Sequence, residues 1–349
     1  MAADSGASRA TAFTPFAMTF PSCWSTRQRS TNSGSVAQQT DTLDRLAAGS
    51  RVAIIRLRSL GDCVLSTPAI RLLKQARPDL EIAVITEEQF RELFENNPGI
   101  ARILLPSARA IRNFAPHLCL NLHGGTRSAR LTLLSGARFR AGFDIFRPAW
   151  LYNTPIPTAQ EILGVRRRVH TAEHMASAMF YLGVPIGEIP RACISAPADR
   201  SRFAPERDYA VIHPLAATPE KTWPAAFFIE LARYFGRNLN LEPVFIGGRG
   251  EDLSRFQMWR TVSGAPLSAV AQLLRDAAFF AGNDSGPAHI AAAFGVPEVV
   301  FFGPSDAEIW APWRTAARVL KAQGPIHTIT VDEALKNVNQ VLSPARTHQ

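Results

Sequence analysis

Several loops of this 349-residue chain carry residue types that bind anions or move protons. In the segment GNDSGPAHIAAAFG, Asp284 or Ser285 is a good helix N-cap, and Pro287 stands near the first helical position. The free N–H groups and the dipole of such a helix attract anions, Gly286 allows close approach to the backbone, and His289 falls on the first turn. From this segment alone, a well-capped helix without a ligand explains the residues equally well.

Two further loops follow apolar runs. HPLAATPEKTWP (213–224) holds Thr218 and Lys221, and the lysine either neutralises a diphosphate or is an ordinary solvated side chain. GGRGED (247–252) leaves room for a nucleoside beside Gly247 and Gly248. Because such loops lie at the carboxyl ends of strands, they together favour a nucleotide or phosphate ligand.

The segment RSLGD places Asp62 at the start of a helical pattern. A carboxylate there would repel a phosphate, so this turn is not expected to bind one. The helix dipole and Arg56 or Arg58 would favour the ionised form, which can accept a proton from a hydroxyl group. The alternative is that Asp62 only caps its helix.

The motifs that the chain lacks narrow the chemistry. It has neither G-x-x-x-x-G-K-[ST] nor G-x-G-x-x-G, which argues against a P-loop NTPase and a nicotinamide dehydrogenase. The expected folded region has no D-x-D and no His/Cys cluster. We therefore predict no metal and no cofactor.

Strand and helix patterns alternate from residue 51 onward, which predicts an α/β protein with parallel, doubly wound sheets. The expected strands are RVAIIR (51–56), EIAVIT (81–86), ARILL (101–105), HLCLNLH (117–123), FRAGF (139–143), YAVIHP (209–214), EPVFIGG (242–248), DAAFFAGND (276–284) and EVVFFGP (298–304). Helices are expected after most of them, including one at 170–182 and one starting at Glu251.

Three segments follow from these patterns. Residues 1–48, rich in Ser, Thr, Ala and Gln, are expected to be a disordered extension. A first Rossmann-like domain with a proline-rich linker would span 49–200, and a second such domain 201–349. The cleft between two such domains is the default ligand site.

Composition sets the broad class. With 46% hydrophobic and 19% charged residues the chain should be soluble, and its four widely spaced cysteines suit a reducing compartment. The longest apolar stretch is too short to span a bilayer. The net charge of +9 suits a phosphate-bearing partner, but the chain has no helix-turn-helix, RNA-recognition or zinc-finger signature, so nucleic acid is not expected.

The sequence resembles glycosyltransferase family 9, the ADP-heptose:lipopolysaccharide heptosyltransferases. The motifs that carry the resemblance occur in order from about Arg51: IIRLRSLGDCVLSTPAIRLLKQARPD, ENNPGI, HPLAATPEKTWP, FIGG and GNDSGPAHIAAAFGVPEVVFFGPSD. The resemblance implies a GT-B fold, in which two Rossmann-like domains face a cleft. It also implies an inverting, metal-independent transfer of heptose from ADP-heptose to a lipopolysaccharide core acceptor.

The resemblance also implies roles for individual residues. Asp62 resembles the catalytic base, and Lys221 the lysine that contacts the donor diphosphate. The donor side would comprise Thr218, Lys221, Gly247, Gly248, Asp284, Ser285, Gly286 and His289. The acceptor side would comprise Arg56, Arg58, Ser59, Gly61, Gly124 and Arg127. Several relatives carry hydroxyl residues at about Ala216 and Ala217, where this chain offers Thr218 nearby.

Other functions remain open at this point. The chain could transfer another sugar, act as an epimerase on a nucleotide sugar, or bind nucleotide sugars or nucleic acid without catalysis. Under the heptosyltransferase interpretation, the partners are a nucleotide sugar and a lipid-linked core oligosaccharide. The expected location is then the cytoplasm, with peripheral contact to the inner membrane through arginines that face anionic lipid.

Overall fold

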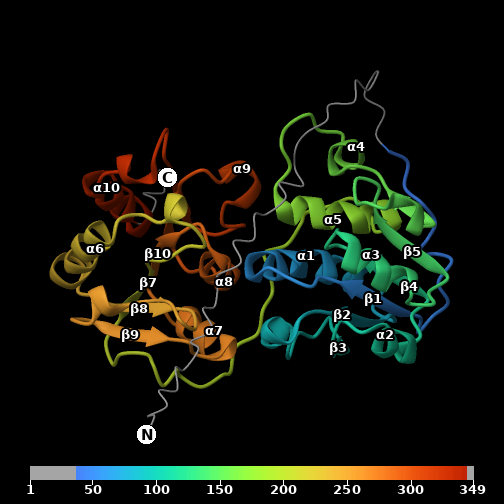
Figure 1. The fold of residues 1–349 in the computed structure, drawn as a ribbon, viewed down its shortest axis with the longest axis horizontal. Coiled ribbons are helices and arrows are strands. Elements are labelled where there is room, and N and C mark those ends of the chain that lie inside the picture. Colours follow the sequence, from blue (N-terminus) through green and yellow to red (C-terminus); the bar gives the residue numbers. More distant parts are fainter. Residues whose placement is uncertain (1–36, 344–349) are drawn as a thin grey trace, which may run out of the picture. The chain divides into compact units, whose positions relative to one another are not determined.

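The first half of the chain forms a six-stranded parallel sheet, drawn in blue to green in Figure 1. The computed structural model describes residues 37–343. The strand order is β3-β2-β1-β4-β5-β6. The strands are β1 (Arg51–Ile55), β2 (Glu81–Ile85), β3 (Arg102–Leu104), β4 (Leu118–Asn121), β5 (Phe139–Phe143) and β6 (Thr154–Ile156). The helices are α1 (Leu60–Ala76), α2 (Ala108–Phe114), α3 (Thr126–Leu133), α4 (Ala159–Leu163) and α5 (Thr171–Leu182).

The second half repeats this plan with a second parallel sheet of order β12-β11-β10-β7-β8-β9. Its strands are β7 (Tyr209–His213), β8 (Glu242–Gly247), β9 (Arg260–Ser263), β10 (Phe279–Asn283), β11 (Glu298–Phe302) and β12 (Ala317–Lys321). The helices are α6 (Ala225–Asn238), α7 (Leu267–Arg275), α8 (Gly286–Phe294), α9 (Ala307–Trp310) and α10 (Val331–Leu342). When the second sheet is followed from β9 to β12, its strand order is the same as that of the first sheet from β3 to β6. The predicted doubly wound architecture is therefore confirmed in both halves.

The hydrophobic cores lie on both faces of each sheet. Residues 52–55 of β1 are fully buried, as are residues 280 and 281 of β10, because helices cover both sides of a parallel sheet. Helix α1 packs against α5 in the first half and against α8 in the second. Both sheets thus belong to one compact unit of the described chain.

The structure corrects the expected N-terminal extension. Residues 1–36 lie outside the described residues, but residues 37–48 do not form a free tail. Leu43 and Leu46 are buried in the first core, and the backbone N–H groups of Thr40 and Leu43 donate to carbonyls of α5. The sparse apolar residues of this segment are therefore enough to fix it against the sheet's helical layer.

The sequence does not predict three of the strands, and it predicts one helix that the structure does not have. β6, β9 and β12 were missed because they are short or lie at sheet edges, where Pro155 and exposed charged residues are tolerated. The helix expected from Glu251 is wrong, since that segment forms only a short 3-10 helix, η4 (Ser254–Phe256), before β9. Its apolar residues Leu253 and Phe256 are buried in the second core without helical periodicity.

Candidate active site

The loops singled out from sequence lie at corresponding places in the two sheets. Residues 56–61 follow β1 and residues 123–127 follow β4, the two strands between which the first sheet reverses its order. In the second sheet, residues 214–221 follow β7 and residues 284–289 follow β10. Ligands of open α/β sheets bind at these reversal points, outside the carboxyl ends of the strands. The topology therefore selects the same loops as the residue types did.

Asp62 lies on the first turn of α1 and is fixed through both carboxylate oxygens. One oxygen accepts hydrogen bonds from the backbone N–H of Ser59 at 3.3 Å and from its hydroxyl at 3.0 Å. The other forms an ion pair with the guanidinium of Arg56. The Asp62 side chain is 18% exposed, so it caps its helix and still reaches solvent.

Arg56 itself is enclosed. The residue is 4% exposed, and besides Asp62 its guanidinium donates to the carbonyl oxygen of Leu122 at 2.5 Å. A buried charge is tolerated only when it is paired and hydrogen-bonded, and Asp62 supplies that pairing. Because its head group is occupied in this way, Arg56 presents little surface to an acceptor.

Two histidines lie close enough to Asp62 and Arg56 to feel their charges. Burial lowers the pKa of His123 to about 4, with Arg56 acting in the same direction and Asp62 against it. Burial likewise lowers the pKa of His174 to about 3. The His174 ring stacks on Phe143 with centroids 3.9 Å apart. The lowered pKa values favour the neutral imidazoles, so the charge that Asp62 meets at this place comes from Arg56 and not from the two histidines.

The donor-side loop begins helix α8 with free N–H groups. Ser285 is the N-cap residue, but its side chain does not cap the helix, because its hydroxyl pairs with Nδ1 of His213 at 2.8 Å. The ammonium of Lys221 lies 3.6 Å from the carboxylate of Asp284. The Lys221 cation and the uncapped N-terminus of α8 both attract a diphosphate, whereas the Asp284 carboxylate, which the lysine partly neutralises, opposes it.

The N-termini of α1 and α8 are in direct contact. A Cβ atom added to Gly61 would lie 2.5 Å from Cδ2 of the His289 ring. A Cβ added to Gly286 would collide with the side chain of Leu60. Burial lowers the pKa of His289, while the charges of Asp284 and Asp62 both act to raise it. The structure thus brings the residues expected to act on acceptor and donor to one place.

The turn expected to receive a nucleoside is partly filled by Glu251. Its carboxylate accepts a hydrogen bond from the Gly248 N–H at 2.6 Å and lies 3.7 Å from Nε2 of His213. A Cβ on Gly247 would meet Leu253 at 3.2 Å. The neighbouring His213 imidazole lowers the pKa of the Glu251 carboxyl, which favours the carboxylate. A ligand in this turn would therefore meet a carboxylate as well as backbone.

The acceptor-side loop is shaped by the last residue of β4. Asn121 Oδ1 accepts hydrogen bonds from the N–H groups of His123 at 3.0 Å and Gly124 at 3.3 Å. Gly124 has φ +74°, and a Cβ there would lie 2.9 Å from the Phe146 ring, so only glycine fits. Arg127 is exposed and pairs with Glu87 at 2.8 Å.

The remaining predicted residues lie at the edges of this site. Arg58 and Ser59 are exposed at the turn before α1, and Thr218 is half-buried in the loop before Lys221. The Thr218 carbonyl accepts hydrogen bonds from the Lys221 N–H at 3.1 Å and the Thr222 hydroxyl at 2.9 Å, which fixes the lysine loop.

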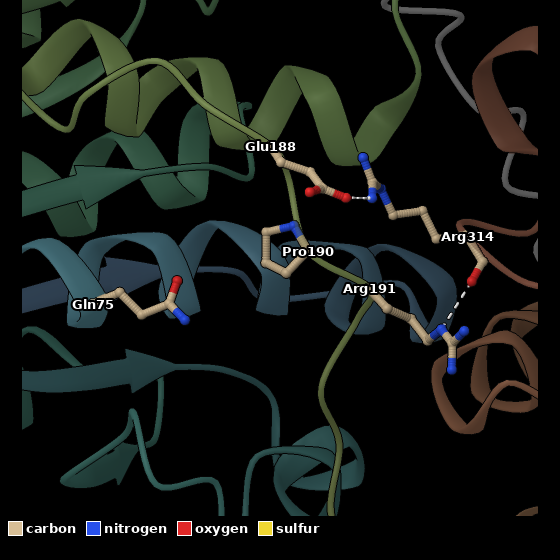
Figure 2. A pocket seen from close by; sticks show the side chains of 5 residues that line it. All are labelled: Gln75, Glu188, Pro190, Arg191 and Arg314. Carbon is tan, nitrogen blue, oxygen red and sulfur yellow. Dashed lines mark hydrogen bonds and ion pairs between the residues drawn. The ribbon is translucent and has the colours of Figure 1, made fainter.

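A cavity among the described residues lies away from this site. Figure 2 shows this space of about 510 Å³, which is lined by Gln75, Glu188, Pro190, Arg191 and Arg314. Gln75 is near the C-terminus of α1, about 20 Å along the helix axis from Asp62. Both arginines already have partners, since Arg314 pairs with Glu188 and Arg191 donates to the Arg314 carbonyl at 2.8 Å.

Four polar residues of the site were not singled out from sequence: His123, His174, His213 and Glu251. His123 and His213 stand at or just after strand ends, which is a signal that could have identified them. His174 lies inside α5, where nothing local distinguishes it. Within residues 37–343, no three His, Cys, Asp or Glu side chains converge in a way that could hold a metal ion.

The chain is similar to proteins of known family. Residues 106–337 match the family described as Glycosyltransferase family 9 (heptosyltransferase). The chain is 26% identical over 300 residues to lipopolysaccharide heptosyltransferase 3 of Escherichia coli, covering 74% of this chain and 84% of that one.

Two solved structures share the fold. One is a family 9 glycosyltransferase from Veillonella parvula DSM 2008, with a TM-score of 0.73, 23% identity and coverage of 84% of this chain and 97% of that one. The other is the E. coli ADP-heptose lps heptosyltransferase II, with a TM-score of 0.70, 20% identity and coverage of 83% and 98%. The expected GT-B architecture is thereby confirmed.

Proposed function

The chain belongs to glycosyltransferase family 9, and we propose that it transfers a heptose from ADP-heptose to a hydroxyl group of a lipopolysaccharide core acceptor. It is a glycosyltransferase by family membership. The observation that carries the specific proposal is the contact of Gly61 with His289, since it places Asp62 next to the loop of Lys221 and Asp284.

The donor side of the proposal rests on charge. A nucleotide diphosphate leaving group carries negative charge that grows as the glycosidic bond breaks, so it needs cationic or dipolar stabilisation. Lys221 and the uncapped N-terminus of α8 offer both, and Gly286 lets the phosphate oxygens approach the backbone. The similarly folded E. coli enzyme is named for ADP-heptose, which motivates the choice of this donor.

The proposed reaction is a single displacement. Asp62 accepts the proton of the acceptor hydroxyl while the hydroxyl oxygen bonds to the anomeric carbon of the donor from the face opposite the diphosphate. The bond between that carbon and the diphosphate oxygen breaks, ADP departs with the electron pair, and the configuration inverts. Lys221 and α8 stabilise the departing charge, and the proposal includes no metal ion and no cofactor.

We assign Arg56 the role of positioning Asp62. The guanidinium contacts one carboxylate oxygen and the Ser59 hydroxyl the other, which fixes the orientation of the carboxylate. This differs from the acceptor contact expected from the family resemblance, because Arg56 is buried. Arg58, Gly124 and Arg127 remain the proposed acceptor-side residues.

The proposed acceptor is attached to a lipid, so the reaction would occur on the cytoplasmic face of the membrane that carries it. No helix within residues 37–343 is long and apolar enough to cross a membrane. Peripheral contact with the membrane is part of the proposal because the acceptor is attached to a lipid, and no nucleic-acid partner is proposed because the sequence has no nucleic-acid-binding signature.

A donor screen tests the proposal. ADP-heptose, UDP-, GDP- and dTDP-sugars are offered with and without a detergent-solubilised lipid A core acceptor, and nucleotide release is measured. The expected result is release from ADP-heptose that requires the acceptor and is lost in Asp62→Asn. Acceptor-independent consumption of a UDP-sugar would instead indicate an epimerase, and release from another donor would indicate transfer of another sugar.

A further inference from the structure

The first half of the molecule carries a concentration of exposed apolar side chains. Six large apolar residues are exposed among the described residues, and three of them, Leu133, Ile145 and Trp150, lie on α3 or in the segment after β5. Trp150, in the 3-10 helix η2 (Ala149–Leu151), is 78% exposed, the largest value of the six. Isolated exposed apolar residues need no explanation, but a group that includes a tryptophan indicates a contact surface.

The fold holds these side chains outward. The 3-10 helix η2 contacts α3. Phe146 points inward and packs on Gly124, and Leu151 is also buried, whereas Ile145, Arg147 and Trp150 are exposed. Arg130 and Leu133 share the exposed face of α3. We call the surface formed by Arg130, Leu133, Ile145, Arg147 and Trp150 the α3–η2 strip.

The strip carries uncompensated positive charge. Within residues 37–343, neither Arg130 nor Arg147 has an ion-pair partner, in contrast to Arg127 at the start of α3, which pairs with Glu87. The acidic residue of the segment, Asp144, precedes the strip. Two free guanidinium groups beside a tryptophan and two aliphatic side chains match the boundary between anionic headgroups and acyl chains.

We propose that the α3–η2 strip docks the protein on an anionic bilayer. This inference rests on the proposed function, which requires an acceptor anchored in lipid. The strip adjoins the acceptor-side loop through the contact of Phe146 with Gly124. Docking would therefore bring the headgroup layer to that loop, with Trp150 and Ile145 inserted at the interface and Arg130 and Arg147 on the anionic headgroups.

Vesicle sedimentation tests the docking without any sugar substrate. The full-length protein is mixed with vesicles of phosphatidylethanolamine and phosphatidylglycerol, or of phosphatidylcholine alone, at low and at 0.5 M salt. Binding is expected on the anionic vesicles only and should weaken as salt screens the arginines. Trp150→Ala is expected to bind about tenfold more weakly, whereas Met258→Ala, which removes an apolar side chain that is 68% exposed in the second half, should bind normally.

A charge-matched pair separates local contact from net charge. Arg130→Gln/Arg147→Gln should lower vesicle partitioning by roughly 25-fold, or about fivefold for each arginine. Arg233→Gln/Arg237→Gln on exposed positions of α6 makes the same change in net charge and should have little effect. Equal losses from both pairs, or equal binding to neutral and anionic vesicles, would overturn the proposal.

A third measurement distinguishes lipid docking from sugar recognition. If Trp150 stacked on the acceptor's sugars instead, Trp150→Ala would slow transfer to a detergent-solubilised acceptor and leave vesicle binding unchanged, and the docking proposal would be wrong. We expect the reverse pattern. Because the sedimentation assay needs no turnover, failure of the donor screen would not affect its result.

Discussion

The contact between Gly61 and His289 permits a quantitative prediction. A Cβ at residue 61 would lie 2.5 Å from Cδ2 and 3.0 Å from Nε2 of the imidazole, whereas ordinary contacts begin at 3.4 Å. His289 is 4% exposed and cannot rotate into solvent. In Gly61→Ala, the N-termini of α1 and α8 must therefore separate by about 1 Å, because carbon atoms cannot approach more closely.

The consequence for catalysis should exceed that for stability. Overpacking of this kind costs about 1 to 3 kcal/mol of unfolding free energy, and alanine's helix propensity offsets up to about 1 kcal/mol of it. A displacement of about 1 Å between reacting groups can reduce turnover about 100-fold. We therefore expect Gly61→Ala to remain folded, with kcat for nucleotide release reduced by about two orders of magnitude.

Gly236→Ala is the matched control, because it makes the same chemical change inside α6 with nothing within 4 Å of the new Cβ. It should be neutral for turnover and slightly stabilising. In a His289→Ala background the clash is removed, so Gly61→Ala should then cost measurably less unfolding free energy in urea titrations. If Gly61→Ala matched Gly236→Ala in both turnover and stability, the two helix ends would not meet as described.

Three further outcomes follow from other residues. Asp62→Asn should bind donor normally in calorimetry but lose about 10²- to 10⁴-fold in turnover, since it cannot accept a proton; near-normal turnover would exclude Asp62 as the base. Neither carboxylate oxygen of Glu298 has a hydrogen-bond partner within residues 37–343, and burial raises the pKa of this carboxyl well above its usual value of 4.5. The native protein then holds a proton that the unfolded chain releases, so the stability that this group contributes is lost as pH rises above about 4.5. Over that range, the unfolding free energy of Glu298→Gln, measured by urea titration, should rise relative to that of the wild type. Burial lowers the pKa of His174 to about 3, so the stability that this group contributes is lost as pH falls below about 6.5. In that range, His174→Phe should reduce the slope of unfolding free energy against pH by up to about 1.4 kcal/mol per pH unit.

Two results would contradict the titration arguments. An advantage of Glu298→Gln that is constant from pH 4 to pH 8 would mean that the carboxyl does not change its protonation on unfolding. An unchanged acid slope in His174→Phe would assign the acid sensitivity to other groups, such as His123, whose pKa is also lowered to about 4.

Much of the architecture could be predicted from the sequence because it is local. Central strands of parallel sheets are buried on both faces, so β1, β7 and β10 appear as continuous apolar runs. The loops after them were recognisable by their glycines, Asp62, Lys221 and Asp284. The edge strands β6, β9 and β12 were not, because an edge tolerates Pro155 and exposed charged residues that a central strand would exclude.

The sequence by itself therefore determined where the central strands lie and which polar loops follow them. Which loops meet was decided by tertiary structure, since Gly61 and His289 are far apart in the chain and only the packing of α1 on α8 joins them. The same holds for Arg56, which is an ordinary surface candidate in sequence but is buried on Asp62 and Leu122 in the fold. The physical reason is that burial and pairing depend on neighbours supplied by distant segments, which no local pattern records.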